Sequence, residues 1–314
     1  MYSAPPQERD AVGVYGKIPT QGDFVRVNAA DAAAQSLDLW VQENLESLQR
    51  AGLDFPAEPT YFLHHRLDPS VPVTVGAMCR SQDRVGRAYP MVVFARIQPA
   101  WIAPRFPAVF VGYGHFLRAA TRLLGDLPRA DGQLLGAWAR QLRLPGPQEL
   151  GAADGVCRQS LDGTAAGAVL GRLFGDPARG LRYHGLKTVV EACDAARAGP
   201  SRVPITLEFP LQADLDFFSV LELCRRRLFG SGIVPTMVWR EDVTPRAVVS
   251  LGPAHGSMMR FLVSPDEGSN ALWPLMTSRD DVVARSAQSL APHHRQVLDR
   301  FDLPLETLLA VLSR

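Results

Sequence analysis

A glycine and a lysine follow the first apolar run of the chain in part of a phosphate-binding pattern. Such a loop has the sequence Gly-x-x-x-x-Gly-Lys-Ser/Thr and leads directly into a helix, because its free amides bind phosphate and its hydroxyl binds Mg²⁺. Gly16 and Lys17 are present, but Ala11 stands where the first glycine belongs, and Ile18 and Pro19 follow the lysine. The sequence therefore predicts no nucleotide here. Gly112-Tyr113-Gly114 lacks a third glycine at dinucleotide spacing, and we interpret it as close packing within a helix.

Two pairs of adjacent histidines are the strongest candidates for metal ligands. His64-His65 lies in a predicted strand, where neighbouring side chains point to opposite faces. His293-His294 lies in a predicted helix, where neighbouring side chains also diverge. Neither pair has a further histidine or a carboxylate at ligand spacing. We expect no bound metal and no cofactor.

The sequence contains no Gly-x-Ser-x-Gly pentapeptide, which marks the nucleophile of many hydrolases. Cys157 and Ser160 have no histidine close in sequence, although the partners of a nucleophile can converge in the fold. We therefore expect a protein that is not an enzyme. A hydrolase with a site assembled from distant residues remains the alternative.

Composition limits the other classes of function. The 314 residues include 33 Lys+Arg and 32 Asp+Glu, a formal net charge of +1 that indicates no nucleic-acid partner. No apolar run approaches the roughly 18 residues of a transmembrane segment, and the first ten residues lack the apolar core of a signal peptide. The four cysteines lie far apart and are expected to be buried, reduced side chains. These features predict a cytoplasmic protein.

Strand and helix patterns alternate along the chain in two blocks. Amphipathic spacing over 31–50 predicts a helix, and the β-rich runs 73–80 and 89–97 around a polar turn predict a hairpin. Further strands are predicted at 12–17, 61–67, 203–209, 234–240 and 246–251. Further helices are predicted at 107–124, 131–142, 164–174, 186–198, 214–229, 256–263, 279–290, 293–301 and 305–312, with flexible turns joining those between 145 and 201.

This alternation predicts a mixed β-sheet flanked by helices, an αβα sandwich. We expect 12–17, 73–80 and 89–97 to be strands of one sheet. We divide the chain into an α/β core at 11–129, a mostly helical insertion at 130–201 and a C-terminal α/β part at 202–314 with a helical tail. Whether both strand blocks share one sheet stays open.

Two segments are less usual than a generic domain requires. They are Tyr15-Gly16-Lys17-Ile18-Pro19-Thr20-Gln21-Gly22-Asp23-Phe24-Val25 and Ser81-Gln82-Asp83-Arg84-Val85-Gly86-Arg87-Ala88-Tyr89-Pro90.

In the first segment, Gly16 and Gly22 can supply backbone angles that other residues avoid, and Asp23 can cap the segment that follows. In the second, Arg84 and Arg87 either pair with Asp83 or present forked donors to an acidic partner. A loop that holds both arginines near Asp23 would fix two turns at once, so we expect the segments to be adjacent. Phe24, Trp40 and Tyr89 are predicted core residues.

In this order, around a helix that carries Trp40, the two segments resemble the TagF/ImpM family of type VI secretion accessory proteins. The resemblance covers the first hundred residues well. A weaker likeness to the family's C-terminal pattern lies in Val234–Trp239, Ser250–Pro253 and Trp273–Leu275. Residues 130–201 match no pattern of the family.

The resemblance implies a cytoplasmic, non-catalytic regulator that lowers type VI secretion after translation. It implies binding to a component of the apparatus, such as a forkhead-associated scaffold protein, and a structural adaptor is the further alternative. The motif residues proposed for partner binding are Lys17, Asp23, Asp83, Arg84 and Arg87. The sequence leaves the oligomeric state and the binding surface open.

Overall fold

The computed structural model describes residues 12–66, 68–198, 204–241, 244–265 and 269–314. The first ten residues, predicted to lack a signal peptide, lie outside the described residues. So do the predicted domain boundary at 201/202 and the first residue of the strand predicted at 203–209. The described strands are β1 (Val12–Gly16), β2 (Val25–Val27), β3 (Thr60–His64), β4 (Val73–Cys79), β5 (Met91–Ile97), β6 (Thr206–Pro210), β7 (Thr236–Arg240), β8 (Arg246–Ser250) and β9 (Leu272–Pro274).

The α-helices are α1 (Ala32–Arg50), α2 (Pro99–Ile102), α3 (Val109–Gly112), α4 (Gly114–Gly125), α5 (Gly132–Ala139), α6 (Pro147–Gly163), α7 (Ala166–Phe174), α8 (Leu181–Arg197), α9 (Asp214–Arg227), α10 (Met258–Val263), α11 (Asp280–Ser289), α12 (Pro292–Leu298) and α13 (Leu305–Leu312). Short 3₁₀ helices are η2 (Phe106–Ala108), η3 (Leu127–Arg129) and η4 (Pro177–Arg179). Among the described helices, none is long and apolar enough to cross a membrane.

All nine described strands form one mixed sheet in the order β2-β1-β5-β4-β3-β7-β8-β6-β9. The predicted hairpin is confirmed, since β4 pairs antiparallel with β5, and β5 pairs in turn with β1. The two strand blocks meet where β3 pairs with β7, with Phe62 opposite Val238. Both blocks therefore belong to one sheet, and the predicted α/β class with a mixed, helix-covered sheet is confirmed.

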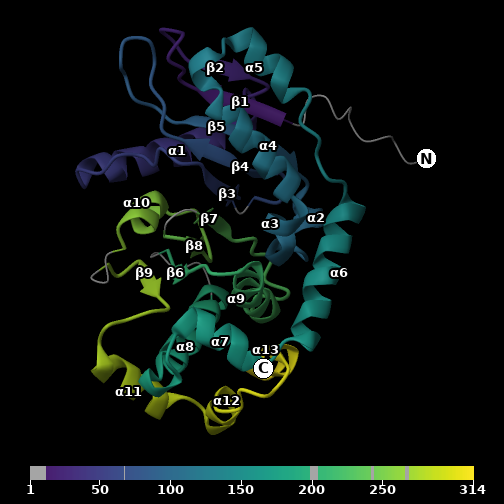
Figure 1. The fold of residues 1–314 in the computed structure, drawn as a ribbon, viewed down its shortest axis with the longest axis vertical. Coiled ribbons are helices and arrows are strands. Elements are labelled where there is room, and N and C mark those ends of the chain that lie inside the picture. Colours follow the sequence, from purple (N-terminus) through teal and green to yellow (C-terminus); the bar gives the residue numbers. More distant parts are fainter. Residues whose placement is uncertain (1–11, 67, 199–203, 242–243, 266–268) are drawn as a thin grey trace.

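Helices cover both faces of the sheet (Figure 1). Alternate residues of β5 enter different cores: Val93 and Ala95 pack on one face, whereas Val92 and Phe94 pack on the other. The first face is covered by helices that include α4, α5 and α9, and the second by α1 and α10. Because both faces are dry, every residue of β4 is buried.

Helix α1 forms where the sequence predicts it. The Asp31 side chain accepts a hydrogen bond from the Ala34 amide at 2.9 Å and caps the first turn. Leu37, Trp40 and Val41 make the buried stripe. Gly52, with φ of +69°, follows the last turn, as expected for the end of a helix.

Several elements differ from the sequence prediction. The helix predicted over 107–124 is broken at Tyr113 between α3 and α4, and a Cβ on Gly112 would lie 2.7 Å from Leu150 Cδ1. No helix was predicted over 147–163, where α6 begins at Pro147 and has a Glu149 carboxylate that accepts a hydrogen bond from the Gly146 amide at 2.9 Å. The sequence also missed β2 and β9, which have only three residues each.

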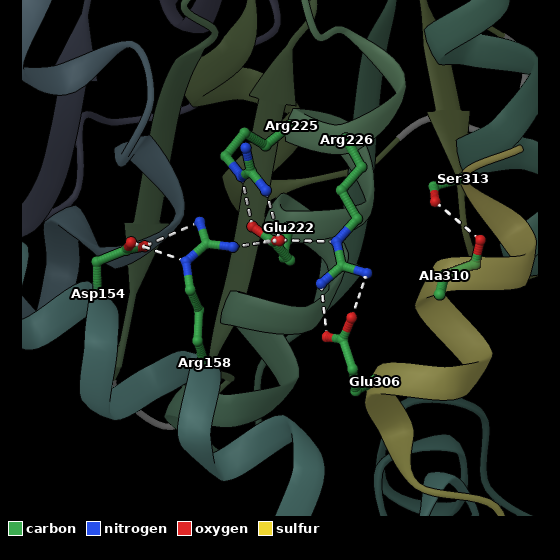
Figure 2. Close-up of polar contacts among 8 residues, drawn as sticks. All are labelled: Asp154, Arg158, Glu222, Arg225, Arg226, Glu306, Ala310 and Ser313. Atoms are coloured by element: carbon green, nitrogen blue, oxygen red, sulfur yellow. Dashed lines mark hydrogen bonds and ion pairs between the residues drawn. The ribbon is translucent and has the colours of Figure 1, made fainter.

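A buried carboxylate joins three helices on one side of the molecule (Figure 2). Glu222 of α9 is fully buried and accepts hydrogen bonds from Arg225, Arg226 and Arg158, the last of which comes from α6. Arg226 also binds both carboxylate oxygens of Glu306 on α13. Burial alone would raise the pKa of Glu222, but the arginines lower it below its ordinary value. The carboxylate is therefore charged and fully paired.

We expect Glu222→Gln to lower the free energy of unfolding by about 3 kcal/mol, because it removes the buried negative charge that Arg158, Arg225 and Arg226 share. Chemical denaturation followed by circular dichroism measures the change. Glu306→Gln is the matched control, since Glu306 is partly exposed and its loss should cost about 1 kcal/mol or less. Equal losses for the two variants would contradict the role given to Glu222.

Candidate functional site

The turn between β1 and β2 packs against the loop between β4 and β5. The Arg84 amide donates to the Gln21 carbonyl at 2.8 Å, and the Ser81 hydroxyl donates to the Lys17 carbonyl at 2.6 Å. The Arg87 guanidinium donates to the Gly22 carbonyl. The prediction that the two motif segments lie together is confirmed by these bonds.

Asp83 is the centre of this contact, and its side chain is completely buried. One carboxylate oxygen accepts from the amides of Val85 and Arg87 at 3.0 and 2.9 Å. The other accepts from Arg87 Nε at 2.6 Å and lies 3.2 Å from Lys17 Nζ. One side chain thus shapes its own loop and binds the lysine of the neighbouring turn.

Burial would raise the pKa of Asp83, because it disfavours the charged form. The hydrogen bonds from the Arg87 amide and side chain, from Lys17 and from the Val85 amide outweigh burial and hold the pKa well below its ordinary value. Asp83 is therefore ionised at any physiological pH. Lys17 and Arg87 supply the positive charge that a buried carboxylate needs.

Asp23 binds the backbone of the segment that follows it, but it does not join the two turns. Its Oδ1 accepts a hydrogen bond from the Phe24 amide at 2.7 Å, directly before strand β2. No ion pair joins Asp23 to Arg84 or Arg87 among the described residues. Asp83 takes the position that the sequence analysis gave to Asp23, because it is buried between the turns whereas Asp23 is exposed.

The two motif arginines, Arg84 and Arg87, make different kinds of contact. Arg87 belongs to the Asp83 cluster through its side chain. Arg84 holds the turns together only through its backbone, and its exposed guanidinium has no ion pair within the described part of the chain. Of the alternatives left open for these residues, internal pairing therefore holds for Arg87 alone.

Phe24 was predicted to be a core residue and is not. Its ring is 36% exposed and packs edge-on against buried Tyr89, with centroids 4.9 Å apart. Lys17 Nζ lies 5.3 Å from the centre of the same ring, within range of a cation–π contact. Trp40 and Tyr89 are buried as predicted.

The exposed side chains of Asp23, Phe24, Arg84, Val85 and Arg87 form what we call the motif surface. Val85 is 68% exposed at the tip of the second turn. Val85 was not among the predicted site residues, although an aliphatic residue in an otherwise polar turn is a signal of exposure. Two apolar side chains and the exposed guanidinium of Arg84 therefore project from turns that are fixed by a buried cluster of charged side chains.

The two motif glycines are not equivalent. Gly16 has φ of +136°, and a Cβ there would lie 2.3 Å from the Pro90 carbonyl oxygen. Gly22 does not have a positive φ, and the nearest atom to an added Cβ is Arg84 Nη2 at 3.8 Å. The expectation of special backbone angles thus holds for Gly16 and is wrong for Gly22.

The other chemical candidates do not form a site. Burial and the neighbouring His65 lower the pKa of His64 to about 3, and its ring stacks on Trp40 with centroids 5.1 Å apart. The rings of His293 and His294 lie 4.2 Å apart, so the expected divergence of this pair is wrong. Within the described ranges, no group of three or more His, Cys, Asp or Glu side chains is placed to hold a metal.

Neither of the two side chains considered as nucleophiles is activated. Burial, assisted by the charges of Asp154 and Asp214, raises the pKa of Cys157 to about 11. Ser160 donates its hydroxyl to the Val156 carbonyl one turn earlier.

These features define an α/β sandwich with a preformed, exposed double turn, an arrangement suited to binding. Residues 13–130 match the family model of the TagF N-terminal domain, type VI secretion system-associated. The match covers both motif segments and supports a TagF-type assignment for this N-terminal part of the chain, which is a domain associated with type VI secretion.

Other comparisons add little. No curated protein matches the sequence. Three solved chains match, among them the crystal structure of PA0076 from Pseudomonas aeruginosa PAO1. That protein is 20% identical, with a TM-score of 0.37, and the match covers 47% of this chain and 78% of the other.

Gly16→Ala is expected to destabilise the protein by about 3 kcal/mol or more, because the new methyl group collides with backbone and the positive φ is strained. Gly22→Ala is the matched control and should change the free energy of unfolding by less than about 0.5 kcal/mol. Thermal and urea denaturation compare the two variants. Similar stabilities would show that the close approach at Gly16 is absent in solution.

The depressed pKa of Asp83 has a direct consequence for the turn amides. A lowered folded-state pKa means that the charged cluster is intact above the ordinary value of about 3.9 and is lost only as pH falls toward the folded value. The NMR shifts of the Val85 and Arg87 amides should stay constant down to about pH 4. A titration midpoint at or above the ordinary value would contradict the paired, buried carboxylate.

Proposed function

We propose that this protein is a cytoplasmic, non-catalytic regulator that lowers type VI secretion after translation by binding a component of the apparatus. The partner that fits the family resemblance is a forkhead-associated scaffold protein. The observation that carries the proposal is the motif surface, which lies inside the TagF N-terminal domain.

The motif surface has the properties of a contact region. Its turns are cross-linked by the Asp83 cluster, so binding requires little ordering of the backbone. Phe24 and Val85 are exposed apolar side chains, which favour burial against a partner. Arginine and aromatic residues are also the types that contribute most to protein interfaces.

The charge of the motif surface indicates the chemistry of the partner. Arg84 has a free guanidinium, and Arg26 lies beside Phe24 with its guanidinium carbon 5.6 Å from the ring centre. Arg26 is only partly neutralised, by an exposed pair with Asp38 at 3.1 Å. A partner surface with carboxylates around an apolar contact would complement this arrangement.

Overproduction in the native bacterium should lower secretion in proportion to dose, while levels of the apparatus components stay constant. The bound fraction of the partner follows the concentration of the regulator, which explains the dose dependence. Arg84→Ala should weaken binding about tenfold and shift the dose response accordingly, without loss of stability. Arg122→Ala is the matched control, since Arg122 is exposed on α4 away from both turns.

Comparison of Arg87→Ala with Arg84→Ala distinguishes a loss of binding from a loss of stability. Arg87→Ala removes bonds to Asp83 and to the Gly22 carbonyl, so it should lower the melting temperature as well as the repression. A folded Arg84→Ala protein that represses like the parent chain would remove Arg84 from the contact. Secretion that is unchanged at every dose would refute the regulatory function itself.

A further inference from the structure

A second feature, outside the motif surface, is a pocket of about 220 Å³ in the other half of the sheet. It lies between α3, the start of α9 and the residues that follow β7. Phe110, Phe217 and Trp239 line it, together with the carboxylate residues Asp214 and Glu241. No lysine, arginine or histidine is among the residues that line it. The pocket is therefore aromatic and acidic.

The aromatic side chains form a continuous wall. The rings of Phe110 and Phe217 stack with centroids 4.9 Å apart, and Phe217 lies 5.7 Å from Trp239. These rings are held in place by the core, with exposed fractions of 7% for Phe110, 2% for Phe217 and 1% for Trp239. Such a wall accommodates an apolar stem and a flat, delocalised cation.

Neither carboxylate, Asp214 or Glu241, is part of an ion pair with any described residue, although both are at the pocket. Burial and the nearby charge of Asp214 raise the pKa of Glu241, while the Trp239 indole and the charge of Arg118 lower it by less. A cation placed between the carboxylates would relieve their repulsion.

The indole Nε1 of Trp239 is a further polar group at the pocket. Trp239 is almost wholly buried, and its Nε1 has no hydrogen bond of normal geometry within the described residues. It is close enough to the Glu241 carboxylate to lower the pKa of that group, which places Glu241 beside the indole edge. A buried donor with only a distorted contact to Glu241 can bind a better-placed acceptor oxygen of a ligand, such as a peptide carbonyl.

We propose that this pocket binds an arginine side chain of a partner protein. The guanidinium lies between Asp214 and Glu241, and the methylene stem contacts the aromatic wall. Arginine fits better than lysine because its planar head has five donors in a fixed fork, which can reach two carboxylates, and because it stacks on aromatic rings. This assignment does not depend on the motif surface or on type VI secretion.

The pocket is tested with Nα-acetyl-L-arginine methylamide as the probe and the folded full chain as the target. The readout is the NMR signal of the Trp239 indole N–H, assigned by its absence in Trp239→Phe. The probe should shift this signal saturably in the millimolar range, and added salt should weaken binding. The citrulline counterpart, which has the same shape without the charge, should produce no saturable shift.

Substitutions of Asp214 and Glu241 test whether these carboxylates bind the charged group of the probe. The double change Asp214→Asn with Glu241→Gln should weaken binding about tenfold, because both carboxylates contribute. Asp162→Asn is the control, since Asp162 is an exposed carboxylate at the end of α6 that does not line the pocket. Circular dichroism checks that each variant is folded.

Three outcomes would overturn the proposal. They are equal shifts with the arginine and citrulline probes, unchanged affinity in the folded double variant, and equal or tighter binding of the lysine counterpart. The last would refute the choice of arginine. None of them bears on repression of secretion, so failure here and failure of the proposed function are distinguishable.

Discussion

Burial of both faces of the central strands is the constraint on which this fold depends. Strands β4 and β5 lie in the middle of a nine-stranded sheet, and side chains that alternate along them enter two separate cores. Helices must therefore cover both faces. The requirement extends to single positions. A Cβ built on Gly13 would lie 2.3 Å from the ring of Phe94, so there is no room for a side chain at this position. Small residues in these strands thus make room for large ones on their neighbours.

Dry faces on both sides also determine how charges are placed. A carboxylate buried in such a structure is tolerated only when cations and amides surround it. Asp83 and Glu222 are both fully buried and both held ionised by their partners. Asp83 joins two loops and so fixes an exposed surface, whereas Glu222 joins helices and fixes the scaffold. The same physical rule therefore supports recognition at one place and stability at the other.

Elements with strong periodicity were predictable from the sequence, and weakly patterned ones were not. The stripe of α1 and the β-rich runs of β4 and β5 are long and apolar, so local pattern and tertiary burial agree. Helix α6 buries only Leu150 and Leu161 of its residues, and its position depends on ion pairs that sequence spacing does not reveal. For the same reason, the motif was located from the sequence and pairing of Asp83 with the arginines was one alternative, but Asp23 was expected to join the two turns and does not.

The double turn shows that a family motif combines two kinds of residue. Some motif residues point inward or bind one another: Gly16, Lys17, Asp83 and Arg87. Their structural role alone accounts for much of the unusual sequence pattern. Phe24, Arg84 and Val85 point outward and contribute little to that cluster. A loss of function on changing an inward residue would follow equally from a disordered turn or a lost contact. Only the outward residues can be changed with the turn intact, and they alone can distinguish a binding surface from a purely structural motif.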